Sequence, residues 1–472
     1  MTRTANIIGA GPNGLAAAIT LAQAGFEVQV FEAEPQAGGA CRTLPLTLPG
    51  FHHDFGSAVH GMAAGSPFFR SLPLDKYGLA LIHPTSPLAH PLDDGTAVIL
   101  ERSIDTTAAN LGEDGRAWHE LFAPVAENWF ELAPDLLGPI LFCPRHPVLM
   151  ARLGLRSFPP ARWLANQKFR GERAKALFAG LAAHSFLSLD ETLSAAFGVM
   201  LGAAAHAVGW PIARGGSQSI TMALSAHLES LGGTIALSSR VDRLAEVPTA
   251  DVTMCDITPR QLAHVAGDRL SPEYRRRMER WRYGPAAFKV DYALSNPIPW
   301  RAKECLRAAT VHIGGTLDEI AASESAMSRG LPAERPFVLL VQPTLFDPSR
   351  APEGKHVAWA YCHIPNGSTF EMLPRLEAQI ERFAPGFRDC VLARHVFSPA
   401  ALEQMDANLI GGDIVGGAMN LRQLLFRPTG NNYATSAPDI FLCSSSTPPG
   451  GGVHGMCGHN AAKRALKMLE AT

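Results

Sequence analysis

The sequence has 472 residues, of which 47% are hydrophobic and 18% are charged, and its formal net charge is −2. This length exceeds the usual size of one hydrophobic core, so we expect two domains, and the apolar content excludes wholesale disorder. Near-equal acidic and basic totals argue against a nucleic-acid-binding protein, which would carry a basic excess.

The first predicted elements form a βαβ unit around a glycine motif. Ala5 to Ile8 is typical of a short buried strand, and Gly9-Ala10-Gly11-Pro12-Asn13-Gly14 follows it. Leu15 to Ala24 is typical of a helix, and Glu27 to Phe31 of a second strand that ends at Glu32. In this order a glycine motif indicates a dinucleotide site.

Each position of the motif has a physical task. Gly9 permits a tight turn, Gly11 lacks the Cβ that would block a pyrophosphate, and Gly14 lets the helix pack closely on the strand. The free N–H groups at the start of the helix, Asn13 included, favour negative charge. Glu32 can accept hydrogen bonds from a ribose diol and would repel a 2′-phosphate, which disfavours NADP.

A glycine pair, Gly38-Gly39, comes shortly after this acid and would let the backbone double back along a cofactor. The arrangement E-x5-G-G-x-x-R-T resembles the glutathione-reductase-type FAD fold, in the branch with amine oxidases and carotenoid desaturases. It favours FAD as the cofactor, although a plain surface loop is the alternative. The candidate FAD contacts of this stretch are Ala33, Gly38, Gly39, Ala40, Cys41 and Arg42.

The eight cysteines include no C-x-x-C pair and no zinc-ligand spacing, so we expect neither a disulfide-reducing site nor a metal. The apolar stretch from Asn6 to Gly25 contains the glycine motif and has no convincing cleavage site, which argues against a signal peptide. No stretch is long and apolar enough to span a membrane. We expect a cytoplasmic protein; peripheral membrane contact and a homo-oligomer both stay open.

The middle of the chain changes character near Gly209. Before it, Leu111 to Ser185 is helix-rich and broken by proline. After it, we predict a helix over Ser219 to Leu231 and then three strands. These strands cover Thr234 to Leu237, Arg240 to Leu244 and Ala250 to Cys255. The backbone of Val241 is a candidate contact for the adenine.

Later segments predict a second kind of sheet. Ala286 to Leu294, Phe337 to Gln342 and Val357 to His363 are separate strand-like runs, which is typical of antiparallel pairing. A substrate domain inserted into the FAD domain accounts for this change from a βαβ pattern to antiparallel strands.

The carboxy-terminal part supplies a second glycine-rich turn. A strand over Asp439 to Cys443 precedes Gly450-Gly451-Gly452, and Asn460 can cap a helix over Ala461 to Glu470. The glycines offer unhindered N–H donors to the ribityl or flavin end of the cofactor. The candidate contacts here are Gly451, Gly452, Val453 and Met456.

The predicted fold class is therefore α/β, with a Rossmann FAD domain of the glutathione-reductase type and an inserted α+β substrate domain carrying an antiparallel sheet. We assign residues 1–65, 205–260 and 410–472 to the FAD-binding domain. Residues 66–204 and 261–409 form the substrate domain.

Nearly the whole chain resembles the phytoene-desaturase-like FAD oxidoreductases, in particular the branch of pyridine nucleotide-disulfide oxidoreductase domain-containing protein 2. The stretches that carry the resemblance are 9–32, 38–39, 51–60, 209–218, 289–294, 311–315, 342–348, 411–414 and 449–453. The resemblance implies FAD-dependent dehydrogenation. A hydride passes from an apolar or amine small-molecule substrate to flavin N5 and leaves a C=C or C=N bond, and oxygen or a quinone reoxidises the flavin.

Three side chains near these motifs are candidates for catalysis: Asp54, His60 and Arg214. A histidine can act as acid or base near neutral pH, but all three are expected more often to orient or to support structure. Two other functions stay open. One is a flavin amine oxidase with an aromatic cage, and the other is an isomerase or binding protein with a structural FAD.

Overall fold

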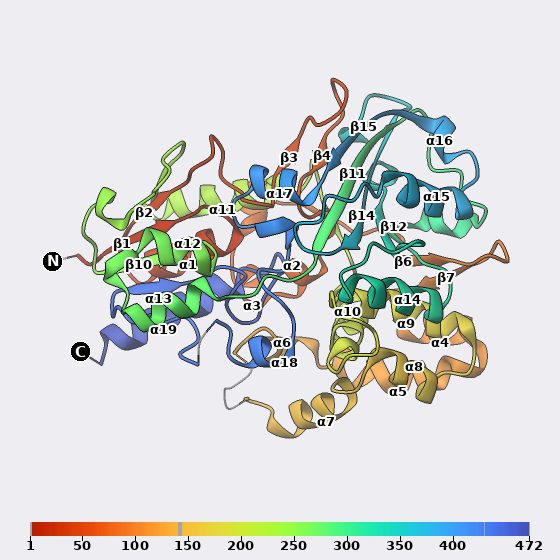
Figure 1. Ribbon diagram of the computed structural model, residues 1–472, viewed down its shortest axis with the longest axis horizontal. Coiled ribbons are helices and arrows are strands. Elements are labelled where there is room, and N and C mark those ends of the chain that lie inside the picture. The colour runs from red at the N-terminus through yellow and green to blue at the C-terminus, as the bar shows by residue number, and fades with distance from the viewer. Residues whose placement is uncertain (1, 140–143, 429, 472) are drawn as a thin grey trace.

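The computed structural model describes residues 2–139, 144–428 and 430–471. Its strands form two large sheets, which lie in the left and right halves of Figure 1. A group of helices fills the lower right of the same view, beneath the second sheet.

The first sheet has five strands, all parallel, with β1 at its centre. Its order is β16 (Ile440–Leu442), β10 (Val252–Cys255), β1 (Thr4–Ile8), β2 (Glu27–Phe31) and β9 (Thr234–Ala236). Because all strands run the same way, their carboxyl ends meet at one edge, which is where ligands bind in open parallel sheets.

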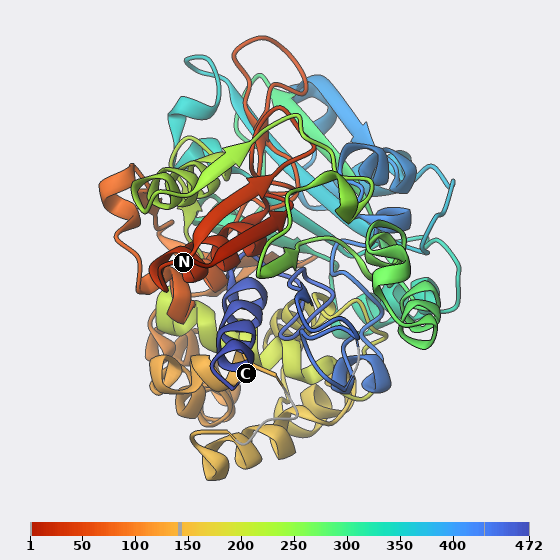
Figure 2. The same cartoon turned by 90° about the vertical axis from the view of Figure 1, so that its left-hand side faces the viewer.

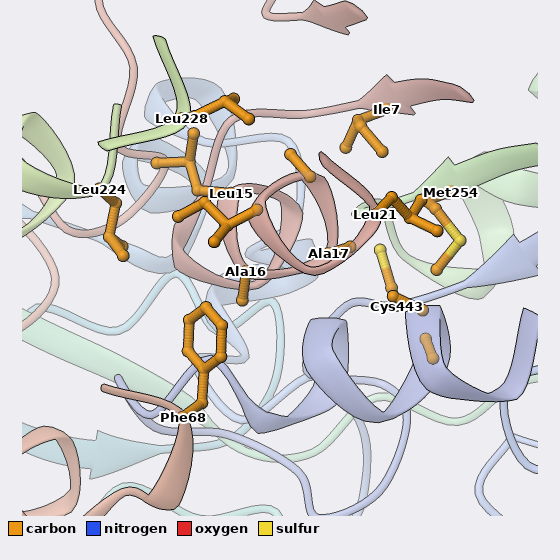
Figure 3. Close-up of a cluster of buried hydrophobic side chains, with 14 of the residues drawn as sticks. Ile7, Leu15, Ala16, Ala17, Leu21, Phe68, Leu224, Leu228, Met254 and Cys443 are labelled. Atoms are coloured by element: carbon orange, nitrogen blue, oxygen red, sulfur yellow. The ribbon is translucent and has the colours of Figure 1, made fainter. Parts of the chain in front are cut away.

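Helix α1 (Pro12–Gln23) packs between this sheet and the carboxy-terminal helix α19 (Met456–Leu469). A proline at the first position suits the start of α1. Figure 3 shows the apolar side chains of this core, where Leu15 and Leu21 of α1 lie among Met254, Leu224 and Leu228. Figure 2 shows α19 beside the strands at the amino terminus.

The second sheet has seven strands, all antiparallel except for the pair β12 and β6. Its order is β15 (Val391–Phe397), β11 (Ala286–Leu294), β14 (His356–Ile364), β13 (Val338–Val341), β12 (Ala308–Ile313), β6 (Ser86–Pro91) and β7 (Ala97–Leu100). One face shares a core with α15 (Leu373–Phe383). The opposite face carries Trp359, Tyr361 and Leu339.

The helical group has its own core, built around Trp118, Phe122 and Phe178. Its helices are α4 (Ile104–Asn110), α5 (Gly115–Ala126), α6 (Trp129–Leu136), α7 (Pro147–Ser157), α8 (Ala161–Lys168), α9 (Glu172–Ala183), α10 (Ser194–Val208) and α14 (Leu317–Ser328). Prolines lie inside α5 and α6, in the region that the sequence predicted to be helical and broken by proline.

Shorter elements complete the fold. The remaining helices are α2 (Gly61–Gly65), α3 (Pro67–Arg70), α11 (Gln218–Ser230), α12 (Pro259–Val265), α13 (Pro272–Glu279), α16 (Phe387–Cys390), α17 (Pro399–Met405) and α18 (Leu421–Leu425). Two small ribbons pair β3 (Thr43–Leu44) with β4 (His53–Asp54) and β5 (Leu81–Ile82) with β8 (Ile212–Ala213).

Two predicted elements differ in the structure. Arg240 to Leu244 is not a strand, because β9 is the edge of its sheet and no further strand of the described residues lies beside it for pairing. The last helix begins at Met456 instead of Ala461, after Gly455 in a left-handed conformation. Asn460 therefore lies inside the helix, and its side chain donates to the carbonyl of Leu137.

The α/β fold class with a Rossmann-type sheet is confirmed, while the domain bounds stay a prediction. No helix of the described residues is long and apolar enough to cross a membrane. Seven of the eight cysteines lie in the described part of the chain, all with free thiols, and Cys143 lies outside it.

Candidate active site

The candidate site begins at the carboxyl edge of the parallel sheet, where the turn after β1 meets the end of β2. Gly9 has a φ of +99°, and its N–H donates to the carbonyl of Phe31 at 2.8 Å. The Glu32 carboxylate accepts from the N–H of Ala10 at 2.7 Å and from that of Glu34 at 3.0 Å. Burial raises the pKa of Glu32, although these two hydrogen bonds favour its charged form.

The start of α1 presents donors that the protein itself does not use. Among the described residues, the N–H groups of Gly11 and Asn13 have no backbone or side-chain acceptor, and the buried Oδ1 of Asn13 has no partner either. The first N–H groups of a helix lack intrahelical acceptors and favour an anion. Here they lie next to glycines, so a phosphate could approach the backbone closely.

Asp256 is a part of this edge that the sequence analysis missed. It directly follows β10, and its Oδ2 accepts from the N–H of Gly14 at 2.8 Å. Burial raises the pKa of Asp256 to about 7, and the nearby carboxylates of Asp406 and Glu32 add to the rise. The signal in the sequence was an acid directly after a predicted strand of the Rossmann unit.

The second glycine pair lies against the first turn. A Cβ on Gly39 would lie 3.3 Å from the Cα of Gly11, and the φ of Gly39 is +52°. The buried Arg42 donates to the carbonyls of Gly39 at 2.7 Å and Met405 at 2.8 Å. Its guanidinium thus shapes the loop. Burial raises the pKa of the Cys41 thiol to about 12, which makes that thiol unreactive at neutral pH.

A cavity of about 780 Å³ joins these turns to the second sheet and to the helical group. Nine of the residues predicted from sequence line it: Gly11, Asn13, Gly39, Ala40, Cys41, His60, Gly451, Gly452 and Val453. The segments meet there although they lie more than 400 residues apart in the chain.

Other predicted cofactor contacts lie outside the cavity wall. Four of them hold the turns in place through hydrogen bonds: Gly9, Gly14, Glu32 and Gly38. At each of the three glycines an added Cβ would lie within about 3 Å of a neighbouring atom. Ala33 is exposed, Val241 packs beside the cluster that contains Ile8, and Met456 is buried in the first turn of α19. Their assignment to the cofactor stays a prediction.

The floor of the cavity is one face of the seven-stranded sheet. Thr310, Val341 and Trp359 lie opposite one another on β12, β13 and β14, and all three line the cavity. Leu339 and Tyr361 form the next row on the same face, because alternate residues of a strand point to the same side. The rings of Trp359 and Tyr361 are 5.2 Å apart at an angle of 76°.

A buried ion pair flanks this floor and was also missed. Lys289 of β11 lies opposite Tyr361 and donates to Asp291. Its Nζ is 5.7 Å from the centroid of the Trp359 ring. Burial lowers the pKa of Lys289, and burial raises that of Asp291 to about 6. Two charges within a strand that was otherwise apolar were the signal in the sequence.

Of the three predicted catalytic residues, His60 alone lines the cavity. Both nitrogens of its ring are buried and have no hydrogen-bond partner among the described residues, and burial lowers its pKa to about 4. The imidazole is therefore neutral at neutral pH.

Asp54 and Arg214 lie elsewhere. Asp54 is buried away from the cavity wall, 2.9 Å from a guanidinium nitrogen of Arg350, and it accepts from Thr43 and Ser217. Burial alone would raise the pKa of Asp54, but Arg350 and the hydrogen bonds hold it below its usual value. Arg214 is exposed on the turn after β8.

The described residues contain no cluster of histidine, cysteine or acidic side chains that could hold a metal ion. Their donors fit an organic cofactor better. Free N–H groups at a helix start, a buried carboxylate after β2 and an adjoining cavity that reaches the second sheet suit a dinucleotide.

Comparisons with known proteins agree with this geometry. Residues 7–72 match a family model described as an NAD(P)-binding Rossmann-like domain. The chain is 27% identical over 547 residues to pyridine nucleotide-disulfide oxidoreductase domain-containing protein 2 from Mus musculus, covering 98% of this chain and 93% of the relative. It is 25% identical over 251 residues to a 4,4'-diapophytoene desaturase (4,4'-diapolycopene-forming) from a Methylomonas species, covering 50% and 47% of the two chains.

Among solved structures, putrescine oxidase bound to putrescine superposes with a TM-score of 0.63 at 17% identity, covering 99% of each chain. The two proteins share a fold. The similarity to the branch of the mouse relative that the sequence indicated is confirmed, and the chain is an oxidoreductase with a Rossmann-type dinucleotide-binding fold.

Proposed function

We propose that this oxidoreductase binds FAD and dehydrogenates a largely apolar small molecule, forming a C=C or C=N bond. The observation that carries the proposal is the single cavity that connects the glycine turns of the parallel sheet with the aromatic floor of the second sheet. A redox cofactor bound at the turns would meet a substrate on that floor. Such cavities at the junction of two sheets are common sites for small ligands.

The residues of the turns divide the work of holding FAD. We infer that Glu32 accepts from the adenosine ribose and that the unused N–H groups of Gly11 and Asn13 bind the pyrophosphate. Gly451 and Gly452, at the other end of the chain, line the cavity where the flavin end would lie. When bound, FAD supplies a two-electron acceptor for a hydride.

The cavity walls favour an apolar substrate. Beyond the glycine turns, the walls are formed mainly by aliphatic and aromatic side chains of the sheet floor and of α7 and α10, such as Tyr361, Met150 and Met200. His60 lines the cavity as a neutral imidazole, since burial lowers its pKa to about 4, and we infer that it orients the substrate. Oxygen or a quinone is proposed as the final acceptor, and the cytoplasm as the location.

One observation supports an amine oxidase as the second candidate. Trp359 and Tyr361 stand nearly perpendicular to each other on the floor, as two walls of an aromatic cage would. The walls beside these two rings are nevertheless mainly aliphatic and aromatic, so burying an ammonium group against them would be costly. We therefore favour the uncharged substrate.

The experiment is an anaerobic screen in which loss of the oxidised flavin absorbance reports reduction. Isoprenoids, cyclic ketones and amines are mixed in turn with the purified yellow protein. Bleaching by isoprenoids or ketones supports the proposal, whereas bleaching by amines alone, with peroxide released in air, assigns the amine oxidase function. If the protein converts a substrate while its flavin keeps the oxidised absorbance, both the dehydrogenase and the amine oxidase functions are contradicted, and a non-redox role is indicated.

A further inference from the structure

One stretch of the surface combines exposed apolar side chains with unpaired positive charge. Fourteen large hydrophobic residues of the described chain are exposed, and five of them fall between residues 130 and 163. These five are Phe130, Val148, Leu155, Phe158 and Trp163. Single exposed apolar residues are ordinary, but a concentration of them marks an interaction surface.

Helix α7 forms the centre of this stretch and lies along the bottom edge of Figure 1. Val148, Ala151 and Leu155 occupy one side of the helix at spacings of three and four residues, and all three are exposed. Leu155 keeps 80% of its surface accessible and Val148 keeps 63%. No packing among the described residues explains apolar side chains at these positions.

Cations border this apolar side. Arg152 and Arg156 follow it around the helix, and Arg145 lies just before the helix. None of the three forms an ion pair within the described part of the chain. Arg162 and Arg170 further on do pair, with Asp318 and Glu113.

The sequence reinforces the charge bias of this surface. From Leu136 to Gly171 it contains six lysine or arginine residues and no aspartate or glutamate. A stretch with one sign of charge and an exposed apolar ridge is complementary to an anionic lipid surface. Lipid headgroups attract the cations, and the acyl boundary takes up the apolar side chains.

The inner side of the same helix lines the cavity. Met150, Leu153 and Ser157 are three and four residues apart and face the cavity that holds the proposed substrate. One helix thus separates the cavity from the exposed apolar ridge. An apolar substrate dissolved in a bilayer would have only the thickness of this helix to pass.

We propose that the outer side of α7, with Arg145, Arg152, Val148 and Leu155, binds the surface of an anionic membrane. The helix would lie flat in the interface, without spanning the bilayer. The cavity would then receive its apolar substrate directly from the lipid phase.

Co-sedimentation with vesicles tests this proposal on the full chain. Phosphatidylcholine vesicles that contain phosphatidylglycerol are expected to carry the protein down, and vesicles of phosphatidylcholine alone are expected to carry much less. Arg145→Gln/Arg152→Gln should weaken binding roughly 25-fold, from about fivefold for each cation near an anionic surface. Val148→Ser/Leu155→Ser should weaken binding to both kinds of vesicle.

Matched controls come from exposed residues of other helices and loops. Arg276→Gln/Arg277→Gln removes two exposed arginines of α13, and Met222→Ser/Leu331→Ser removes two exposed apolar residues. Both controls should bind vesicles like the parent. All variants should keep the parent's thermal unfolding temperature and flavin spectrum, because no substituted side chain is buried.

Three results would overturn the proposal. The first is no sedimentation with anionic vesicles, and the second is an equal loss in the control variants. The third is a parent protein that is dimeric without lipid and becomes monomeric with Val148→Ser/Leu155→Ser, because this side of α7 would then bind a second copy of the chain. If the apolar variant fails to fold, the arginine variant alone decides, since its side chains are exposed.

Discussion

At the scale of single residues, two buried aspartates near the glycine turns have opposite electrostatic settings. Asp54 faces the cation of Arg350, so it is held charged. Burial raises the pKa of Asp256 to about 7, and the nearby carboxylates of Asp406 and Glu32 add to the rise. The sequence placed Asp54 near the flavin because it follows a glycine motif, but it could not show the partner, which lies almost 300 residues further on. Asp256 could have been identified from its place after a strand.

Asp54→Asn is expected to destabilise the fold and not to act on catalysis directly. The change leaves the guanidinium of Arg350 buried without a counter-charge, which costs about 3–5 kcal/mol in buried pairs. Urea unfolding measures this difference. The control is Asp242→Asn, which removes an exposed partner of Arg240 and should change stability by less than about 0.5 kcal/mol. A stable Asp54→Asn protein that binds FAD but cannot reduce it would restore the catalytic role.

Asp256→Asn is expected to remove part of the pH dependence of stability of the FAD-free protein. The folded pKa of about 7 exceeds the ordinary value of 3.8, so the folded state binds the proton more tightly. The contribution of Asp256 to stability is present below about pH 4 and is lost as the pH rises through about 7. Asparagine can still accept from the N–H of Gly14. Thermal unfolding of parent and variant across this range should diverge toward higher pH, and parallel curves would contradict the assignment.

At the scale of elements, the βαβ start could be predicted because its signals are local. The strand, the glycine turn and the acid all lie within about thirty residues, and each has a direct physical cause. The start of α19 could not be predicted in the same way. Gly458 has a low helix propensity, yet it lies inside the helix because its missing Cβ permits contact with α1.

The parallel pairing of β6 with β12 could not be predicted from the sequence either, because more than 200 residues separate the two strands. No local signal reports such a pairing.

Gly458→Ala is expected to destabilise the protein and to weaken its hold on FAD. The new Cβ would lie 1.8 Å from the carbonyl oxygen of Asn13, so α19 must move away from the helix start that we assign to the pyrophosphate. Overpacking of this kind typically costs about 1–3 kcal/mol. Gly154→Ala is the control, since nothing lies within 4 Å of its Cβ position in α7. Flavin content and thermal unfolding should fall for Gly458→Ala alone; equal flavin content in the two variants would contradict this account.

At the scale of the whole molecule, the candidate site is a product of long-range assembly. The cavity is closed by turns from both ends of the chain, by a sheet from its middle and by the helical group. Sequence motifs predicted the cofactor side, since glycines at turns have local reasons. They could not predict the sheet face that forms the floor of the cavity. In the sequence Trp359 and Thr310 are ordinary residues of buried strands, and only the register of β12, β13 and β14 places them in one row.

Acid is expected to destabilise the molecule strongly. Eight largely buried imidazoles have pKa values lowered by burial: those of His53, His60, His90, His184, His206, His312, His454 and His459. Unfolding lets them take up protons below their ordinary pKa of 6.5, so the stability they contribute is lost as the pH falls from about 6.5 toward 4. Five buried carboxyls with raised pKa act in the opposite sense: Glu32, Asp256, Asp291, Asp406 and Asp413.

The eight imidazoles outnumber these carboxyls, so we expect a net uptake of protons on unfolding in this range. The unfolding temperature, measured across it, should therefore fall as the pH is lowered. An unfolding temperature that stays constant or rises on acidification would show that the buried histidines are charged or accessible in the folded protein.

The visible absorption spectrum of the purified protein tests the central claim most directly. We expect a yellow protein with the absorption of an oxidised flavin, which heat releases as FAD, and a Gly11→Val variant that folds but is colourless. A Cβ at Gly11 would lie 2.8 Å from Asp256 Oδ2 and would fill the place that we assign to the pyrophosphate. A fully folded parent protein that is colourless and cannot be reconstituted with FAD would contradict the account.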